Sequence, residues 1–122
     1  MKEWFEYELI ESIYFERDLS KLCRNEQEED EVKRFVALNR KKGDGIGRTG
    51  LKKIRIPLRG KGTRGGGRII YYFTEEEDSY IFYLFIYSKA NQEDLTPREE
   101  KLLENALRVF ISERNEGKRR NK

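Results

Sequence analysis

The sequence predicts an α+β domain in which a small antiparallel sheet carries helices on one side, two near the N-terminus and one near the C-terminus. Two observations predict this class. Successive strand-like segments between residues 51 and 87 are typical of an antiparallel meander. Apolar residues at helical spacing lie before and after that block. Because the chain has 122 residues, we expect residues 1–122 to form a single domain.

The N-terminal part combines an expected edge strand with an expected helix. Aromatic and acidic residues roughly alternate over residues 4–10, which predicts a short strand at or near the sheet edge, beside the meander. Residues 12–25 have a weaker helical pattern, and we expect three apolar side chains on one face: Ile13, Leu19 and Leu22.

A second helix is predicted over residues 28–40, where Val32, Phe35 and Val36 have the i, i+3, i+4 spacing of a buried face. Acids lie in its first turn and cations toward its end, which complements the helix dipole. The glycine-rich segment 43–50 then predicts a loop. It lacks the GxxxxGK[ST] pattern of a phosphate-binding loop, so we do not expect a nucleotide site there.

The meander is predicted from three segments and their connections. Residues 51–57 alternate apolar and basic side chains, and residues 58–67 are predicted to form a mobile basic hairpin loop. A strand over 68–73 follows, then an acidic turn over 74–79. Residues 80–87 are apolar on both faces, so we expect this strand to be central.

The C-terminal helix has the clearest start signal. Thr96 and Glu99 have the spacing of a capping box, and Pro97 stands at the first helical position. An apolar stripe at helical spacing follows: Leu103, Ala106, Leu107 and Phe110. We expect the helix to end near Arg114 and the basic tail, residues 117–122, to fray.

The composition excludes several classes of site. The chain has no histidine and one cysteine, Cys23, so imidazole mechanisms and an intramolecular disulfide are excluded and neither a metal site nor a cofactor is predicted. The longest apolar run, residues 80–87, is too short to span a bilayer. We therefore expect a cytoplasmic protein with no membrane partner.

The small net charge of +3 hides an uneven distribution. No acid occurs between Asp44 and Glu75, whereas this stretch holds many cations. They are Arg48, Lys52, Lys53, Arg55, Arg59, Lys61, Arg64 and Arg68. Such a block favours a polyanionic partner, but a solvated loop in a charge-rich protein explains it equally well.

Strand alternation brings part of this block together with a tyrosine. Lys53 and Arg55 share one face, and Arg68 opens the next strand. In an antiparallel meander, Arg68 and Tyr87 become neighbours at one edge of the sheet. Strict alternation along the last strand puts four side chains on one face: Tyr83, Phe85, Tyr87 and Lys89.

A basic patch with an embedded phenol suits RNA. Cations hold phosphates, and aromatic rings stack on unpaired bases. The same patch could also cleave RNA through the ribose 2′-hydroxyl. A Lys or Tyr whose pKa is lowered by the surrounding cations would be the base, and Arg would stabilise the phosphorane. The alternative is that Tyr83 and Tyr87 are aromatic residues at the edge of the core and the cations keep the sheet soluble.

Residues 50–97 carry a family resemblance. GLKKIRIPLRGKGTRGGGRIIYYF, a strand ending IYSKANQEDLTP and a Leu-rich helix together resemble the RelE/ParE toxin superfamily, in particular its HigB-like branch. The resemblance implies a RelE-like fold and the toxin of a bacterial toxin–antitoxin pair that cleaves mRNA in the ribosomal A site. Its partner would be a HigA-like helix-turn-helix antitoxin, through which alone it would reach operator DNA.

The resemblance also implies roles for particular residues. Lys53 would be the base, Arg55 a phosphate ligand and Arg68 the cation that stabilises the transition state. Tyr87 and Lys89 match the Tyr-x-Lys at the end of the central strand. RNA contacts are expected from Arg48, Lys52, Arg59, Lys61 and Arg64. Because histidine is absent, Lys, Arg and Tyr alone would carry the acid–base chemistry.

Two further functions remain open at this stage. The same fold can carry a ParE-like inhibitor of DNA gyrase that cuts no RNA. A relative that has lost its activity would act only as a nucleic-acid-binding module, with RNA affinity that falls steeply with salt.

Overall fold

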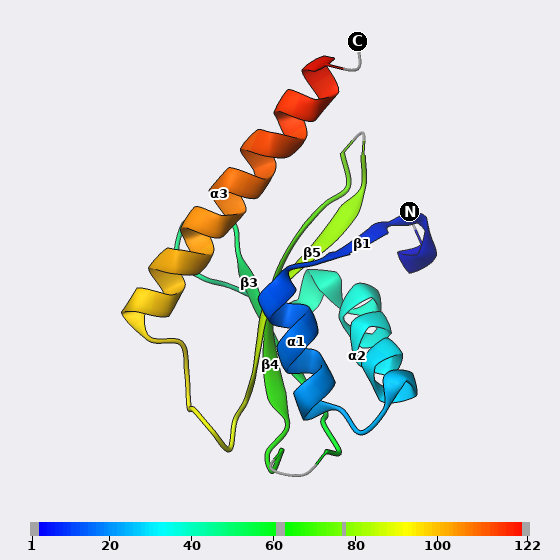
Figure 1. The fold of residues 1–122 in the computed structure, drawn as a ribbon, viewed down its shortest axis with the longest axis vertical. Helices are drawn as coiled ribbons and strands as arrows, with labels where there is room; N and C mark the ends of the chain where they lie inside the picture. The colour runs from blue at the N-terminus through cyan, green and yellow to red at the C-terminus, as the bar shows by residue number, and fades with distance from the viewer. Residues whose placement is uncertain (1–2, 61–62, 77, 121–122) are drawn as a thin grey trace.

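A five-stranded mixed sheet lies between helices in the computed structural model, which describes residues 3–60, 63–76 and 78–120 (Figure 1). The strand order is β1-β5-β4-β3-β2, so the apolar strand β5 is an inner strand, as the sequence predicts. The strands are β1 (Glu8–Glu11), β2 (Asp44–Gly45), β3 (Lys52–Ile56), β4 (Gly67–Thr74) and β5 (Tyr80–Ser88). The predicted α+β class is confirmed.

The expectation of a wholly antiparallel sheet is wrong at one pair of strands. Strand β1 lies at the edge, as predicted, but it pairs with β5 in parallel, with Glu8 opposite Tyr80 and Glu11 opposite Tyr83. Two helices and the rest of the sheet separate β1 from its partner along the chain, so no local turn dictates their relative direction. A short strand, β2, also forms within the segment predicted to be a loop.

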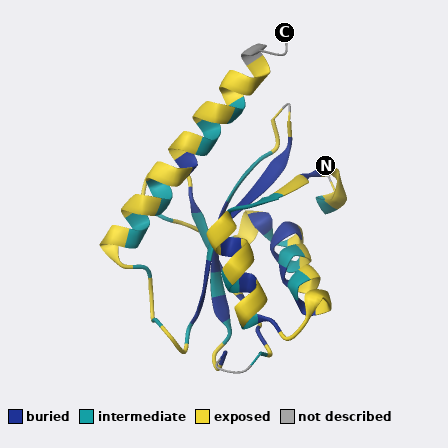
Figure 2. Ribbon diagram, viewed as in Figure 1, coloured by how far each residue is buried: buried dark blue, intermediate teal, exposed yellow. Residues whose placement is uncertain are grey.

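The helices cover both faces of the sheet rather than one. Helices α1 (Ile13–Leu22) and α2 (Glu26–Leu38) pack on one face, and α3 (Pro97–Arg120) packs on the other (Figure 1). Short 3-10 helices occur at Trp4–Glu6 and Arg40–Lys42. Helices are needed on both faces because the inner strand β5 is apolar on both of its faces and each face must be buried. Figure 2 shows the buried strands between the layers.

The α1/α2 face holds the larger core. Val32 and Val36 of α2 are buried there, as predicted, together with Phe15 and Leu19 of α1. The prediction that Ile13 points inward is wrong, because its side chain is 82% exposed. The N-cap sets this orientation: the Ser12 hydroxyl accepts from Phe15 N–H at 3.0 Å and donates to the Leu84 carbonyl at 2.8 Å.

Helix α3 closes the opposite face. Its predicted capping box is present, since Thr96 Oγ1 accepts from Glu99 N–H at 3.1 Å and Glu99 Oε1 accepts from Thr96 N–H at 2.9 Å. Phe110 stacks on Phe82 with ring centroids 4.0 Å apart. The expected end near Arg114 is wrong: the helix continues through Gly117 to Arg120, and the last two residues of the tail, 121–122, lie outside the described part. None of the described helices is long and apolar enough to cross a membrane.

Candidate nucleic-acid interface and catalytic site

Three predicted site residues form a row across adjacent strands on the α3 side of the sheet. Arg55 of β3 is the register partner of Arg68 of β4, and Arg68 is the partner of Tyr87 of β5. The predicted neighbour relation between Arg68 and Tyr87 is therefore confirmed. The row lies at the strand ends of inner strands rather than at the lateral edge of the sheet.

A β-bulge sets which way Tyr87 points. The β4–β5 register shifts between Ile70 and Tyr71, which face Phe85 and Tyr83 respectively and leave Leu84 as an extra residue. Strict alternation placed Tyr83 and Tyr87 on one face, and this expectation is wrong. Tyr83 belongs to the core under α1 and α2, whereas Tyr87 belongs to the core under α3 and joins the arginines.

The glycine run before β4 lets the hairpin close tightly behind the row. Gly66 has a φ of +73°, and a Cβ on it would meet the Ile56 carbonyl oxygen at 2.5 Å. Its carbonyl accepts from Lys89 N–H at 3.0 Å, which joins the hairpin to the end of β5. The close approach brings the ends of three strands together at the site.

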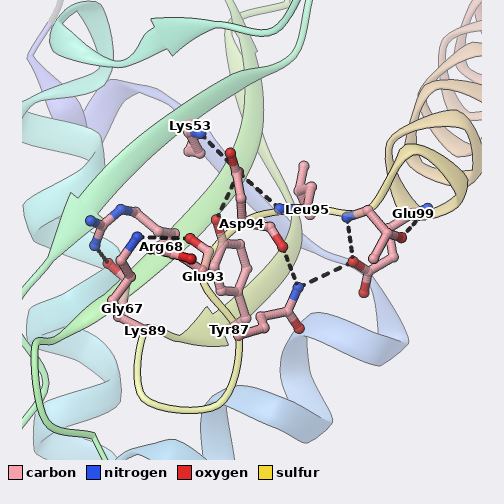
Figure 3. A network of polar contacts seen from close by, with 11 residues as sticks. Lys53, Gly67, Arg68, Tyr87, Lys89, Glu93, Asp94, Leu95 and Glu99 are labelled. Carbon is pink, nitrogen blue, oxygen red and sulfur yellow. Dashed lines mark hydrogen bonds and ion pairs between the residues drawn. The ribbon is translucent and has the colours of Figure 1, made fainter.

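An acidic residue that the sequence reasoning missed lies in the middle of the cluster. Asp94 Oδ1 is 3.0 Å from Lys53 Nζ and accepts from Leu95 N–H at 2.8 Å (Figure 3). The Tyr87 hydroxyl donates to the same oxygen over a longer distance of 3.5 Å. The available signal was the position of Asp94 in the EDLTP segment, which directly follows the Tyr-x-Lys strand end.

The segment between β5 and α3 is fastened to both of its neighbours. Lys89 Nζ donates to the Glu93 carbonyl at 2.8 Å, so this predicted site lysine binds the segment itself in the free protein (Figure 3). Gln92 Nε2 donates to the Asp94 carbonyl at 3.0 Å and to Glu99 Oε1 at 3.1 Å. These bonds fix the connection from which Asp94 reaches Lys53 of β3.

The ionisation of the site differs from expectation. Burial raises the pKa of Tyr87 to about 12, with a further rise from Asp94 and an opposing effect of Arg68. The expectation that nearby cations lower the pKa of this tyrosine is therefore wrong, and Tyr87 holds its proton at neutral pH. The hydrogen bond from Lys53, followed by that from Leu95 N–H, lowers the pKa of the Asp94 carboxyl.

The structure brings only some of the predicted RNA-binding cations near the row. Arg59 and Arg64 are exposed in the connection between β3 and β4, next to the Arg55 end. Lys61 lies outside the described residues. Arg48 precedes β3 at its opposite end, and Lys52 alternates with Lys53 onto the other face, where it reaches the Gly43 carbonyl at 3.5 Å.

An open pocket of about 490 Å³ adjoins the arginine end of the row. Arg55 contributes to its wall, and the remaining lining is mostly apolar. The lining residues are Phe35, Arg55, Ile56, Pro57, Leu58, Gly65 and Gly66. In the described parts of the chain, no group of three or more acidic or cysteine side chains is placed to hold a metal ion.

Comparison with known proteins places the chain in a family. A solved structure of a double mutant of the E. coli toxin RelE in the free state is 18% identical, with a TM-score of 0.49, and covers 71% of this chain and 87% of its own. Residues 11–117 match the family model described as the RelE toxin of the RelE/RelB toxin–antitoxin system. The chain therefore belongs to the RelE toxin family.

Proposed function

We propose that this protein is a ribosome-dependent endoribonuclease of the HigB-like branch, which acts in the cytoplasm on mRNA in the ribosomal A site. A HigA-like helix-turn-helix antitoxin would neutralise it and carry it to operator DNA. The observation that carries the proposal is the row of Arg55, Arg68 and Tyr87, in which two cations and a protonated phenol share one face. Membership of the RelE toxin family supports it.

The row supplies most of what cleavage through the 2′-hydroxyl requires. The 2′-oxygen bonds to phosphorus and loses its proton, while the bond from phosphorus to the 5′-oxygen breaks and that oxygen gains a proton. Arg55 binds the phosphate, and Arg68 stabilises the charge that builds up on it in the transition state. Tyr87 suits the proton donor, because its raised pKa of about 12 keeps the hydroxyl protonated.

Cleavage also requires a group that accepts the proton of the 2′-hydroxyl. Lys53 would take this role as the neutral amine, which requires that it has given up a proton and no longer donates to Asp94. The pocket beside Arg55 and the exposed Arg59 and Arg64 would hold the flanking nucleotides through apolar contact and phosphate binding.

The test is primer extension on a translated mRNA with purified protein and its Arg68→Ala variant. We expect new 5′ ends that require ribosomes, and a loss of about 10²–10³ in cleavage rate for Arg68→Ala. Arg108→Ala removes an equal charge from the outer surface of α3 and serves as the matched control, with unchanged cleavage. Absence of new 5′ ends in the presence of ribosomes contradicts the proposal, and gyrase inhibition without such ends supports the ParE-like alternative.

A further inference from the structure

Three hydrogen-bond donors of different kinds converge on one oxygen of Asp94. They are the Lys53 ammonium at 3.0 Å, the Leu95 backbone N–H at 2.8 Å and the Tyr87 hydroxyl at 3.5 Å. Ammonium, backbone N–H and phenol are also the groups with which proteins bind the phosphate oxygens of nucleic acids. The cluster therefore has the donor set of a phosphate site, and an anion of the protein itself fills it.

We propose that Asp94 is an internal occupant of the phosphate-binding position, and that an RNA phosphodiester displaces it from Lys53 and Tyr87 on binding. This inference rests on the proposed function, because it concerns how the same site receives RNA. It gives the free protein a self-occupied state with reduced affinity for RNA.

Breaking the contact between Asp94 and Lys53 costs little free energy. The Asp94 side chain is 64% exposed and that of Lys53 is 30% exposed, and ion pairs reached by solvent are weak. The segment around Asp94 has further anchors in the Lys89 bond to the Glu93 carbonyl and the Gln92 bond to Glu99. The carboxylate can therefore turn away while its backbone stays attached to β5 and α3.

A role for Asp94 as the proton acceptor fits the site less well. Lys53 and the Leu95 N–H lower the pKa of the carboxyl, and an efficient acceptor has a pKa near the working pH. A fixed carboxylate also repels the phosphate that the arginine row attracts. Both effects favour a group that leaves when RNA binds over one that stays beside the scissile bond.

Binding of a short single-stranded RNA with 2′-O-methylated riboses tests the inference without ribosomes and without cleavage. Fluorescence anisotropy at fixed ionic strength would compare wild type, Asp94→Asn and Glu93→Gln. Asparagine keeps an acceptor for Leu95 N–H and removes the charge, whereas Glu93→Gln changes the net charge equally at the adjacent exposed residue. We expect Asp94→Asn to lower the Kd about two- to fivefold relative to Glu93→Gln.

A double-mutant cycle ties the effect to the ion pair. In a Lys53→Met background only the Tyr87 contact remains to be displaced, so the gain of Asp94→Asn over Glu93→Gln should be smaller than in the wild-type background. The inference is overturned if Asp94→Asn binds RNA no more tightly than Glu93→Gln, if the gain is undiminished without Lys53, or if no variant binds RNA. A protein that shows this gain but never cuts mRNA on ribosomes retains the inference and loses the proposed function.

Discussion

Tyrosines on the two faces of the sheet have different partners. On the α1/α2 face, the Tyr71 hydroxyl donates to the Arg40 carbonyl at 2.6 Å and that of Tyr83 to the Lys33 carbonyl at 2.7 Å. On the α3 face, Tyr87 donates over 3.5 Å to Asp94, a side chain that is 64% exposed. Short bonds to backbone carbonyls fasten the helical segments to the sheet, whereas a long bond to a solvated carboxylate can be exchanged. One face thus maintains the fold, and the other holds replaceable contacts.

The largest expected effect is on the face that maintains the fold. Tyr71 is fully buried, so Tyr71→Ala should lower the free energy of unfolding by about 3–5 kcal/mol through the lost contacts and the cavity. Tyr71→Phe keeps the ring and leaves the Arg40 carbonyl without this donor, at a cost of about 1–3 kcal/mol. Urea unfolding followed by circular dichroism measures both. A Tyr71→Phe protein as stable as wild type would show that the hydroxyl bond does not fasten the helical layer.

A substitution of Tyr87 on the α3 face should reduce the cleavage activity rather than the stability of the fold. Tyr87→Phe removes the proposed proton donor, so ribosome-dependent cleavage should fall by about 10²-fold or more. The free energy of unfolding should change by less than about 1 kcal/mol, because the lost hydrogen bond is long. Single-turnover cleavage and urea unfolding provide the two readouts. Unchanged cleavage, or a stability loss equal to that of Tyr71→Phe, would break the comparison between the faces.

Alkaline pH should destabilise the contacts on both faces of the sheet. Burial raises the pKa of Tyr71 and of Tyr87 to about 12, above the usual value near 10. The folded state therefore holds these protons more tightly, and the stabilisation is complete below about pH 10 and lost as pH rises toward 12. Each tyrosine contributes at most about 1.4 kcal/mol per pH unit to this fall. Urea unfolding between these pH values should show a shallower slope for either Phe variant, and an unchanged slope would contradict the assignment.

Local patterns were sufficient for most elements. The spacing of Val32 and Val36, the cap formed by Thr96 and Glu99, and the apolar strand β5 correspond to helices and strands in the structure. Antiparallel pairing in a meander also predicted that Arg68 meets Tyr87. These features depend on residues close in sequence or on strands joined by short connections. Their signals are therefore local.

The position of Asp94 depends on contacts that no local pattern reports. It lies in a connection whose path is set by α3 packing on the sheet, so its approach to Lys53 depends on residues far away in the sequence. The orientation of β1 and the placement of α3 on the opposite face have the same origin. Each results from burying a remote apolar surface.

The sequence by itself determined most of the element types, the cations of the β3–β4 hairpin and the absence of histidine, because periodicity and composition are properties of the chain. Tertiary structure decided which of these groups meet. One extra residue at the bulge carries Tyr87 to the arginine face and leaves Tyr83 in the opposite core. The physical reason is that strand register is set by pairing between segments, and a shift of one residue exchanges the faces of every residue that follows.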